Sequence, residues 1–154
     1  MRIRHTLPLL FLVAGGLAFA QVKGDDPAAE LKKFEGSWVM VSGKSDGKPV
    51  PSEQVAKNRI VWNSGDVVLD SPHQAKDPIK AKVTIVAASG ATRAMNWTRA
   101  NGPDAGKTML AIYEFRGADE YVVVFAPAGK DRPRDFSAAT GSGHFHHVWK
   151  RVKG

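Results

Sequence analysis

The stretch Ile79-Lys80-Ala81-Lys82-Val83-Thr84-Ile85-Val86-Ala87 decides the fold class. Its apolar and polar side chains alternate, and successive side chains of a β-strand point to opposite faces of the sheet. Ala81, Val83, Ile85 and Ala87 then share one face, and Lys80, Lys82 and Thr84 share the other. The stretch therefore predicts a half-buried strand with one wet side, as in an antiparallel sheet.

Seven further segments have the composition of strands, and most are joined by short turns rich in Gly, Asp and Ser. They are 37–42, 59–63, 67–69, 92–98, 108–115, 120–126 and 144–152. Loops are expected at 71–78 and 101–107, and an irregular connection at 127–143. About eight short strands favour a sandwich or a barrel, and a barrel removes the exposed edges of the sheet. The expected fold is mainly β: an antiparallel β-barrel of about eight strands.

One short helix is expected before the first strand, over residues 27–35. Asp26 can cap its first turn, and Pro27 suits the first helical position. Leu31 and Phe34 lie three apart on one face, and Gly36 can end the helix. A second helical turn is expected within residues 51–57.

The first 20 residues have the parts of a secretory signal peptide. A basic start that includes Arg2 and Arg4 precedes an apolar run, 7–19, and the small residues of Ala18-Phe19-Ala20 close it. The run is shorter than the roughly 20 residues that span a bilayer. Cleavage after Ala20 is therefore expected, and the alternative is an uncleaved membrane anchor.

These patterns divide the chain into a signal peptide (1–20), a flexible lead-in (21–26) and a single domain (27–154). The expected location is the periplasm or the extracellular space, with no membrane span after cleavage. The chain has no cysteine, which excludes disulfides, thiolate metal ligands and a cysteine nucleophile.

The net charge is +7, and removal of Arg2 and Arg4 leaves +5. A basic protein suits an acidic partner, such as a polysaccharide or another acidic envelope component. The basic residues are scattered rather than clustered, however, which favours a simple role in solubility. Nucleic acid is not an expected partner for an exported protein.

Two motifs at opposite ends of the domain resemble a known signature. Gly36-Ser37-Trp38 follows the expected helix, and Lys150-Arg151 ends the last strand. This resembles the Gly-x-Trp and late-Arg pairing of lipocalin-like barrels. The resemblance implies that Trp38 closes one end of the barrel and that Arg151 lies across its ring, a contact worth roughly 0.5 to 2 kcal/mol.

An ordered set of further motifs extends this resemblance over residues 31–151. They are Asp46-Gly47-Lys48, Gly106-Lys107-Thr108, Ile112-Tyr113-Glu114, Arg132-Pro133-Arg134-Asp135-Phe136 and Gly141-Ser142-Gly143. Together they look like the uncharacterised lipocalin-like domain common in planctomycete bacteria. The structural signature is then Gly36, Trp38, Arg132, Pro133, Phe136 and Arg151. Asn96 departs from that family, which has an acidic residue there. The resemblance implies a secreted barrel and supplies no reaction, ligand or cofactor.

The four tryptophans lie on four different predicted strands, and by alternation each can face inward. With two methionines they form the candidate ligand-binding residues: Trp38, Met40, Trp62, Met95, Trp97 and Trp149. Ile60 can share that face. The same side chains also suit a filled core, which eight strands favour because they leave little spare interior volume.

Histidines near the last strand form a weak metal candidate. His144 and His146 lie two apart and share a face, and His147 points the other way. A histidine pair is the usual core of a zinc or copper site, but the third ligand is missing. No metal site is therefore predicted, and the alternative is a solvated strand face.

No catalytic arrangement is found in the sequence. Gly141-Ser142-Gly143 reads as a turn rather than a nucleophile elbow, and the acidic residues fall mainly in turns. In the 127–143 connection, Phe136 is expected to plug the side of the barrel, and the arginines to pair with nearby acids. The alternative is that Arg132, Arg134 and Arg151 recognise an anion. The chain is not expected to be an enzyme.

The first functional hypothesis is a secreted, non-catalytic domain that binds a small apolar or amphipathic ligand inside the barrel. The alternative is a closed-core interaction or structural module of the cell envelope, which would use its basic outer surface. A third hypothesis is a metal-dependent enzyme built on the histidines. A cavity of roughly 300 Å³ or more among the tryptophans distinguishes the first hypothesis from the second.

Overall fold

The computed structural model describes residues 26–86 and 92–154. The predicted signal peptide, most of the lead-in and Ala87 of the predicted strand 79–87 lie outside the described residues. None of the helices within the described ranges has the length and apolarity needed to cross a bilayer.

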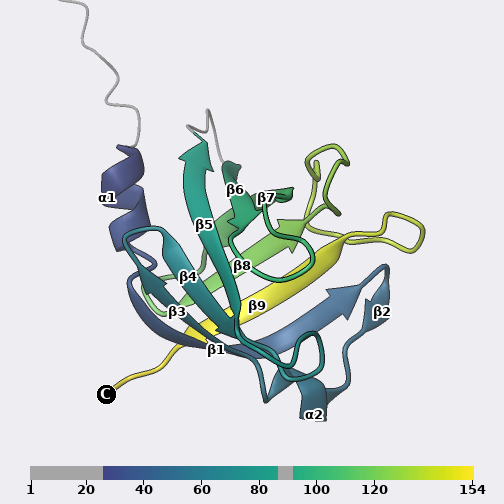
Figure 1. Ribbon diagram of the computed structural model, residues 1–154, viewed down its shortest axis with the longest axis horizontal. Coiled ribbons are helices and arrows are strands. Elements are labelled where there is room, and N and C mark those ends of the chain that lie inside the picture. Colours follow the sequence, from purple (N-terminus) through teal and green to yellow (C-terminus); the bar gives the residue numbers. More distant parts are fainter. Residues whose placement is uncertain (1–25, 87–91) are drawn as a thin grey trace, which may run out of the picture.

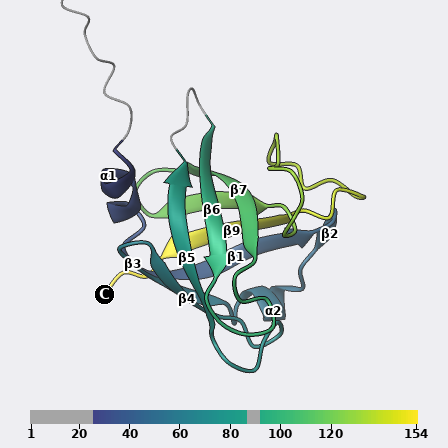
Figure 2. The same cartoon turned by 45° about the horizontal axis from the view of Figure 1, so that its top comes forward.

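The described residues form one antiparallel sheet that closes into a barrel (Figures 1 and 2). Its strands are β1 (Gly36–Ser45), β2 (Lys48–Pro49), β3 (Arg59–Asn63), β4 (Asp66–Asp70), β5 (Ile79–Val86), β6 (Arg93–Arg99), β7 (Thr108–Phe115), β8 (Glu120–Phe125) and β9 (Phe145–Arg151). From β3 onward each strand pairs with the next in the chain, and β9 pairs back with β1. The predicted lipocalin-like barrel of eight strands is confirmed, with β2 as an additional short strand.

The barrel closes because β1 is long enough to serve several partners. Its first residues pair with β3, and its last two pair with β2 on the same side. Its other side pairs with β9, from Trp38 opposite Arg151 to Ser45 opposite Phe145, with a bulge between Met40 and Ser42. A bulge increases the local bend of a strand, which helps a sheet to curl.

The helix α1 (Pro27–Lys32) lies at one end of the barrel (Figure 1). The Asp26 side chain accepts a hydrogen bond from the amide of Ala28 at 3.1 Å, so the predicted cap is present. The helix ends earlier than expected, and the turn that follows carries Phe34 into the barrel, where it is fully buried. Helix α2 (Ser52–Val55) forms within the segment where a helical turn was expected.

Polar contacts hold α1 on the barrel. The Glu30 carboxylate is only 2% exposed. It accepts a hydrogen bond from the Tyr113 hydroxyl at 3.0 Å and lies 3.2 Å from Arg93 Nε and 2.5 Å from Lys33 Nζ. A buried charge with this many partners is satisfied, so the helix position is well defined.

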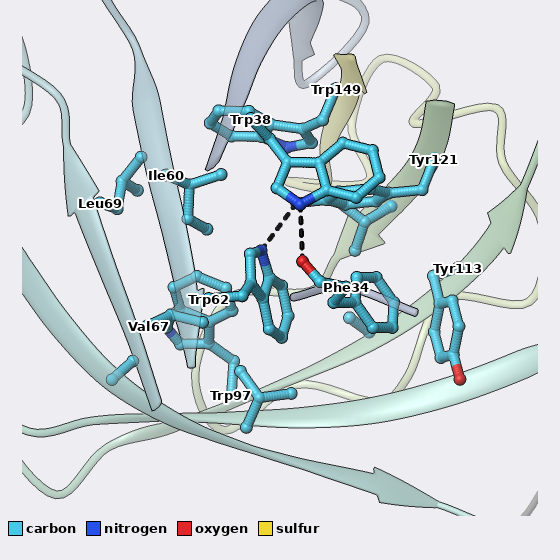
Figure 3. Packing of buried hydrophobic residues seen from close by; sticks show 14 of the residues in the cluster. Phe34, Trp38, Ile60, Trp62, Val67, Leu69, Trp97, Tyr113, Tyr121 and Trp149 are labelled. Carbon is cyan, nitrogen blue, oxygen red and sulfur yellow. Dashed lines mark hydrogen bonds between the residues drawn. The ribbon is translucent and has the colours of Figure 1, made fainter. Parts of the chain in front are cut away.

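Trp38 and Arg151 also belong to the α1 end. Trp38 Nε1 donates to the Phe34 carbonyl at 2.6 Å (Figure 3). The Arg151 guanidinium carbon lies 4.1 Å from the centre of the Trp38 ring, which is the stacking expected from the resemblance. Gly36 has φ +103°, a backbone conformation that favours glycine, and a Cβ there would lie at an ordinary contact distance of 3.5 Å from Arg151.

The long 127–143 connection packs on the outside of the barrel. Phe136 and the buried Ala138 contact Ile112 of β7 and Val124 of β8, in a cluster separate from the interior core. Arg132 does not pair with an acid, contrary to expectation. It donates to the carbonyls of Met95 (2.8 Å) and Ala111 (2.6 Å), and its remaining polar partner is the neutral side chain of Asn96.

Candidate ligand-binding cavity

A cavity of about 470 Å³ occupies the barrel interior and opens at the end away from α1. Its wall comes from the inward faces of the strands, and its rim from the β4–β5, β6–β7 and β8–β9 connections. The wall residues are Ile60, Trp62, Leu69, Ile79, Met95, Trp97, Met109, Tyr121, Val123, Phe125, Phe145, His147 and Trp149. The rim residues are Gln74, Arg99, Asp104, Lys107, Pro127 and Ala128.

Four of the six predicted ligand-binding residues line this cavity: Trp62, Met95, Trp97 and Trp149. The Trp62 and Trp97 rings meet edge to face, with centroids 6.0 Å apart. Strand alternation brings them together, because each occupies an inward position on its own strand.

The other two predicted residues, Trp38 and Met40, do not line the cavity. Trp38 is fully buried at the α1 end, in edge contact with Tyr121 (Figure 3). Met40 is buried beside Asn58, whose amide lies 3.7 Å from its sulfur. Alternation predicts that a side chain faces inward, but it does not predict the height of that side chain along the barrel axis.

Several wall residues were missed by sequence reasoning. Tyr121, Val123 and Phe125 of β8 face the cavity. The intervening residues Val122 and Val124 are buried as well, because other chain segments cover the outer face. A run that is apolar on both faces carries no alternation, so its inward residues could not be read from the sequence.

His147, which was expected only to point away from His144 and His146, lines the cavity. Its ring lies 5.7 Å from Phe125 and 6.0 Å from Trp149. Burial, with a smaller contribution from His146, lowers the pKa of His147 to about 4. The imidazole is therefore neutral at pH 7. Alternation from Trp149, two residues later on the same strand, was the signal that could have identified it.

Tyr121 supplies a polar group deep in the wall. Its hydroxyl accepts a hydrogen bond from Trp62 Nε1 at 3.3 Å, and burial raises the pKa of Tyr121. The hydroxyl stays protonated under ordinary conditions. The deep wall is therefore uncharged, and it suits an apolar ligand body.

Charge is confined to the rim. Lys107 Nζ donates to Asp104 at 2.8 Å, and this contact holds the pKa of Asp104 below its usual range. Arg99 lies on the same face of β6 as Met95 and Trp97, four and two residues before it, and its Nε atom is buried.

The candidate metal ligands do not form a complete site. No cluster of three or more His, Cys, Asp or Glu side chains placed to hold a metal occurs within 26–86 and 92–154. His146 lies opposite Lys44 in the β1–β9 register. Burial first, and then the charge of Lys44, lower the pKa of His146.

The three arginines considered for anion recognition are not gathered at one place. Arg132 bonds to β6 and β7, Arg134 is exposed on the connection, and Arg151 lies at the α1 end. Arg151 also pairs with Asp119 at 3.3 Å. Arg132 and Arg151 each donate hydrogen bonds to nearby backbone carbonyls in different parts of the barrel. The alternative that the three arginines form a joint anion site is therefore wrong.

Comparison of the chain with protein-family models, with curated proteins and with solved structures finds no match. Function is therefore argued from the cavity itself.

Proposed function

We propose that this protein is an exported, non-catalytic binding protein that takes a small apolar or amphipathic ligand into its barrel. The observation that carries the proposal is the interior cavity of about 470 Å³. Ligand pockets in proteins range from roughly 300 to 1,000 Å³ and are mostly apolar with a few polar groups. Export rests on the signal-peptide pattern of residues 1–20.

The size of the cavity favours this proposal over a closed-core envelope module. In a filled barrel the interior side chains make van der Waals contacts with one another, and in an open interior many of these contacts are missing. The aromatic wall offers those contacts to a ligand instead. Among the described residues, the absence of a three-ligand metal cluster leaves the metal-enzyme hypothesis without a supporting observation.

The test uses N-phenyl-1-naphthylamine, a neutral apolar fluorophore, titrated into the purified protein. We expect its emission to rise, with energy transfer from the wall tryptophans, at micromolar concentrations. Val123→Phe should weaken binding by about tenfold or more, because the larger ring occupies the cavity. Val61→Phe is the matched control, since Val61 is 47% exposed on the outer face of β3.

Two results would contradict the proposal: no probe binding by folded protein, or equal weakening by the two substitutions. Native mass spectrometry of protein purified from its own host adds an independent measurement. A reproducible bound small molecule is expected there.

A further inference from the structure

Arg99 is a charged residue of the barrel wall that lines the cavity where β6 ends. It follows Met95 and Trp97 at two-residue intervals, so all three share the inward face of β6. In the β5–β6 register it lies opposite Ala81, which is itself buried in the core. Arg99 therefore occupies the position on β6 where the apolar wall meets the rim, and its Nη2 lies near Gly102 of the β6–β7 connection.

The guanidinium of Arg99 lacks an acceptor within the described part of the chain. Its Nε is buried and makes no hydrogen bond. Asp104, the acidic residue of the same rim, is engaged by Lys107 at 2.8 Å. Arg132 and Arg151 provide the contrast, because each donates to at least two backbone carbonyls. An unpaired buried N–H is costly, so this arrangement favours an acceptor supplied by a ligand.

The charges around the cavity lead to the same conclusion. Lys107 is the main partner of Asp104, and the charge of Arg99 acts on that carboxylate only as a smaller effect. His147 and Tyr121 are neutral at pH 7. One positive charge, that of Arg99, is left among the lining residues. The planar guanidinium fork matches the oxygens of a carboxylate or a phosphate.

We propose that the ligand is an amphipathic anion. Its apolar body lies against Trp62, Trp97 and Trp149, and its carboxylate or phosphate head group accepts hydrogen bonds from Arg99. This inference rests on the proposed function, because it assigns a ligand class to the same cavity.

The test is displacement of bound N-phenyl-1-naphthylamine at pH 7.5 by three ligands with the same chain: decanoate, decyl phosphate and decan-1-ol. We expect at least one anion to displace the probe at a concentration about tenfold lower than the alcohol. The tighter of the two anions identifies the head group. Arg99→Gln should reduce this preference for anions to about one, and Arg99→Lys should retain part of it, because charge remains and the fork is lost.

The control is Lys82→Gln, which makes the same change in net charge on the outer face of β5. The Lys82 side chain is 70% exposed, and its ammonium lies 3.8 Å from the equally exposed carboxylate of Asp66. It should leave the preference for anions unchanged. Equal displacement by the anions and the alcohol overturns the inference, and so does a preference that persists in Arg99→Gln. In both cases probe binding leaves the proposed function standing. Failure of the folded protein to bind the probe overturns both.

Discussion

Arg151, Arg132 and Arg99 carry the same side chain into three different surroundings. Arg151 stacks on Trp38 and donates to carbonyls, and Arg132 donates to carbonyls of β6 and β7. Arg99 lines the cavity, and its buried Nε has no hydrogen-bond acceptor among the described residues. The first two side chains are structural because their hydrogen bonds are made within the fold. The third is the one available to a ligand.

Replacing Arg151 should destabilise the protein strongly. Arg151→Met removes the contact with the Trp38 ring and leaves the Glu35 and Lys33 carbonyls without their donors. We expect the free energy of unfolding to fall by about 2 to 4 kcal/mol in urea titrations. Arg151→Lys should recover only part of this, since an ammonium cannot reproduce the fork.

Lys150→Met is the matched control for this experiment. Lys150 is the neighbouring residue, but its side chain is 58% exposed and lies 3.7 Å from Glu120. Surface ion pairs of this kind contribute about 0 to 1 kcal/mol. Equal losses for the two variants would show that the Arg151 contacts do not stabilise the barrel.

His147 should make the protein less stable as the pH falls from 6.5 to 4. The unfolded histidine binds a proton near pH 6.5, whereas the half-buried His147 of the folded protein binds it only near pH 4. In that window the unfolded chain holds more protons, so acidification favours unfolding, by up to about 3 kcal/mol. His146, whose pKa is also lowered, adds to the same trend.

Urea titrations at several pH values between 7 and 4.5 measure this effect. The pKa values of Asp104, Asp119 and Asp135 are lowered from an ordinary value of 3.8. These carboxylates therefore change the stability only below the pH range in which His147 acts. His147→Gln should flatten the pH dependence, and His73→Gln, at an exposed loop position, should not. A slope that survives in His147→Gln would refute this assignment.

At the scale of elements, the 127–143 connection is ordered by a few contacts with the barrel exterior. Arg132 bridges β6 and β7, the buried Pro133 follows it, and Phe136 packs on the outer cluster. A connection of this length needs such contacts to offset its conformational entropy. The same connection contributes Pro127 and Ala128 to the cavity rim, so its order also shapes the opening.

Arg132→Met should loosen this connection without unfolding the barrel. Loss of charged hydrogen bonds to Met95, Ala111 and Asn96 should speed chymotryptic cleavage beside Phe136 by about tenfold or more. Arg134→Met is the control, because Arg134 is exposed on the same segment. Equal cleavage rates in the two variants would mean that Arg132 does not hold the segment.

At the scale of the whole molecule, closure of β1 onto β9 makes the barrel one cooperative unit. The core cluster draws side chains from α1 and α2 and from all eight barrel strands, and its tryptophans lie on β1, β3, β6 and β9. No part of this cluster can be exposed without separating strands that are distant in sequence. Unfolding is therefore expected to be a single transition.

This expectation is checked by comparing two signals in one urea titration. Tryptophan fluorescence reports the core, and far-ultraviolet circular dichroism reports the strands. The two curves should have the same midpoint. An earlier loss of the fluorescence signal would indicate an intermediate in which the interior opens before the sheet separates.

Prediction from the sequence succeeded where local chemistry decides the structure. The alternation of Ile79–Val86 placed β5, and β3 and β7 have the predicted bounds. Asp26 and Pro27 located the start of α1. The short strand β2 was missed, because two residues carry no period and their pairing depends on the bend of β1.

The candidate site was only partly predictable. Trp62, Met95, Trp97 and Trp149 were placed at the cavity, whereas Trp38 lies at the closed end. Arg99 was not singled out, since an arginine at the end of an alternating strand is ordinary in sequence. Arg99 stands out only in the folded protein, where its Nε is buried without a hydrogen-bond partner among the described residues.

The sequence by itself determined the eight barrel strands and, where polar and apolar residues alternate, which side chains face inward, because a two-residue period acts between neighbours in the chain. Only the tertiary structure decided that the interior is hollow, how high each tryptophan lies along the axis and that Arg99 Nε is buried without an acceptor in the part of the chain that the structure describes. Those features depend on the stagger of strands around the barrel and on contacts between residues far apart in sequence, which no local pattern encodes.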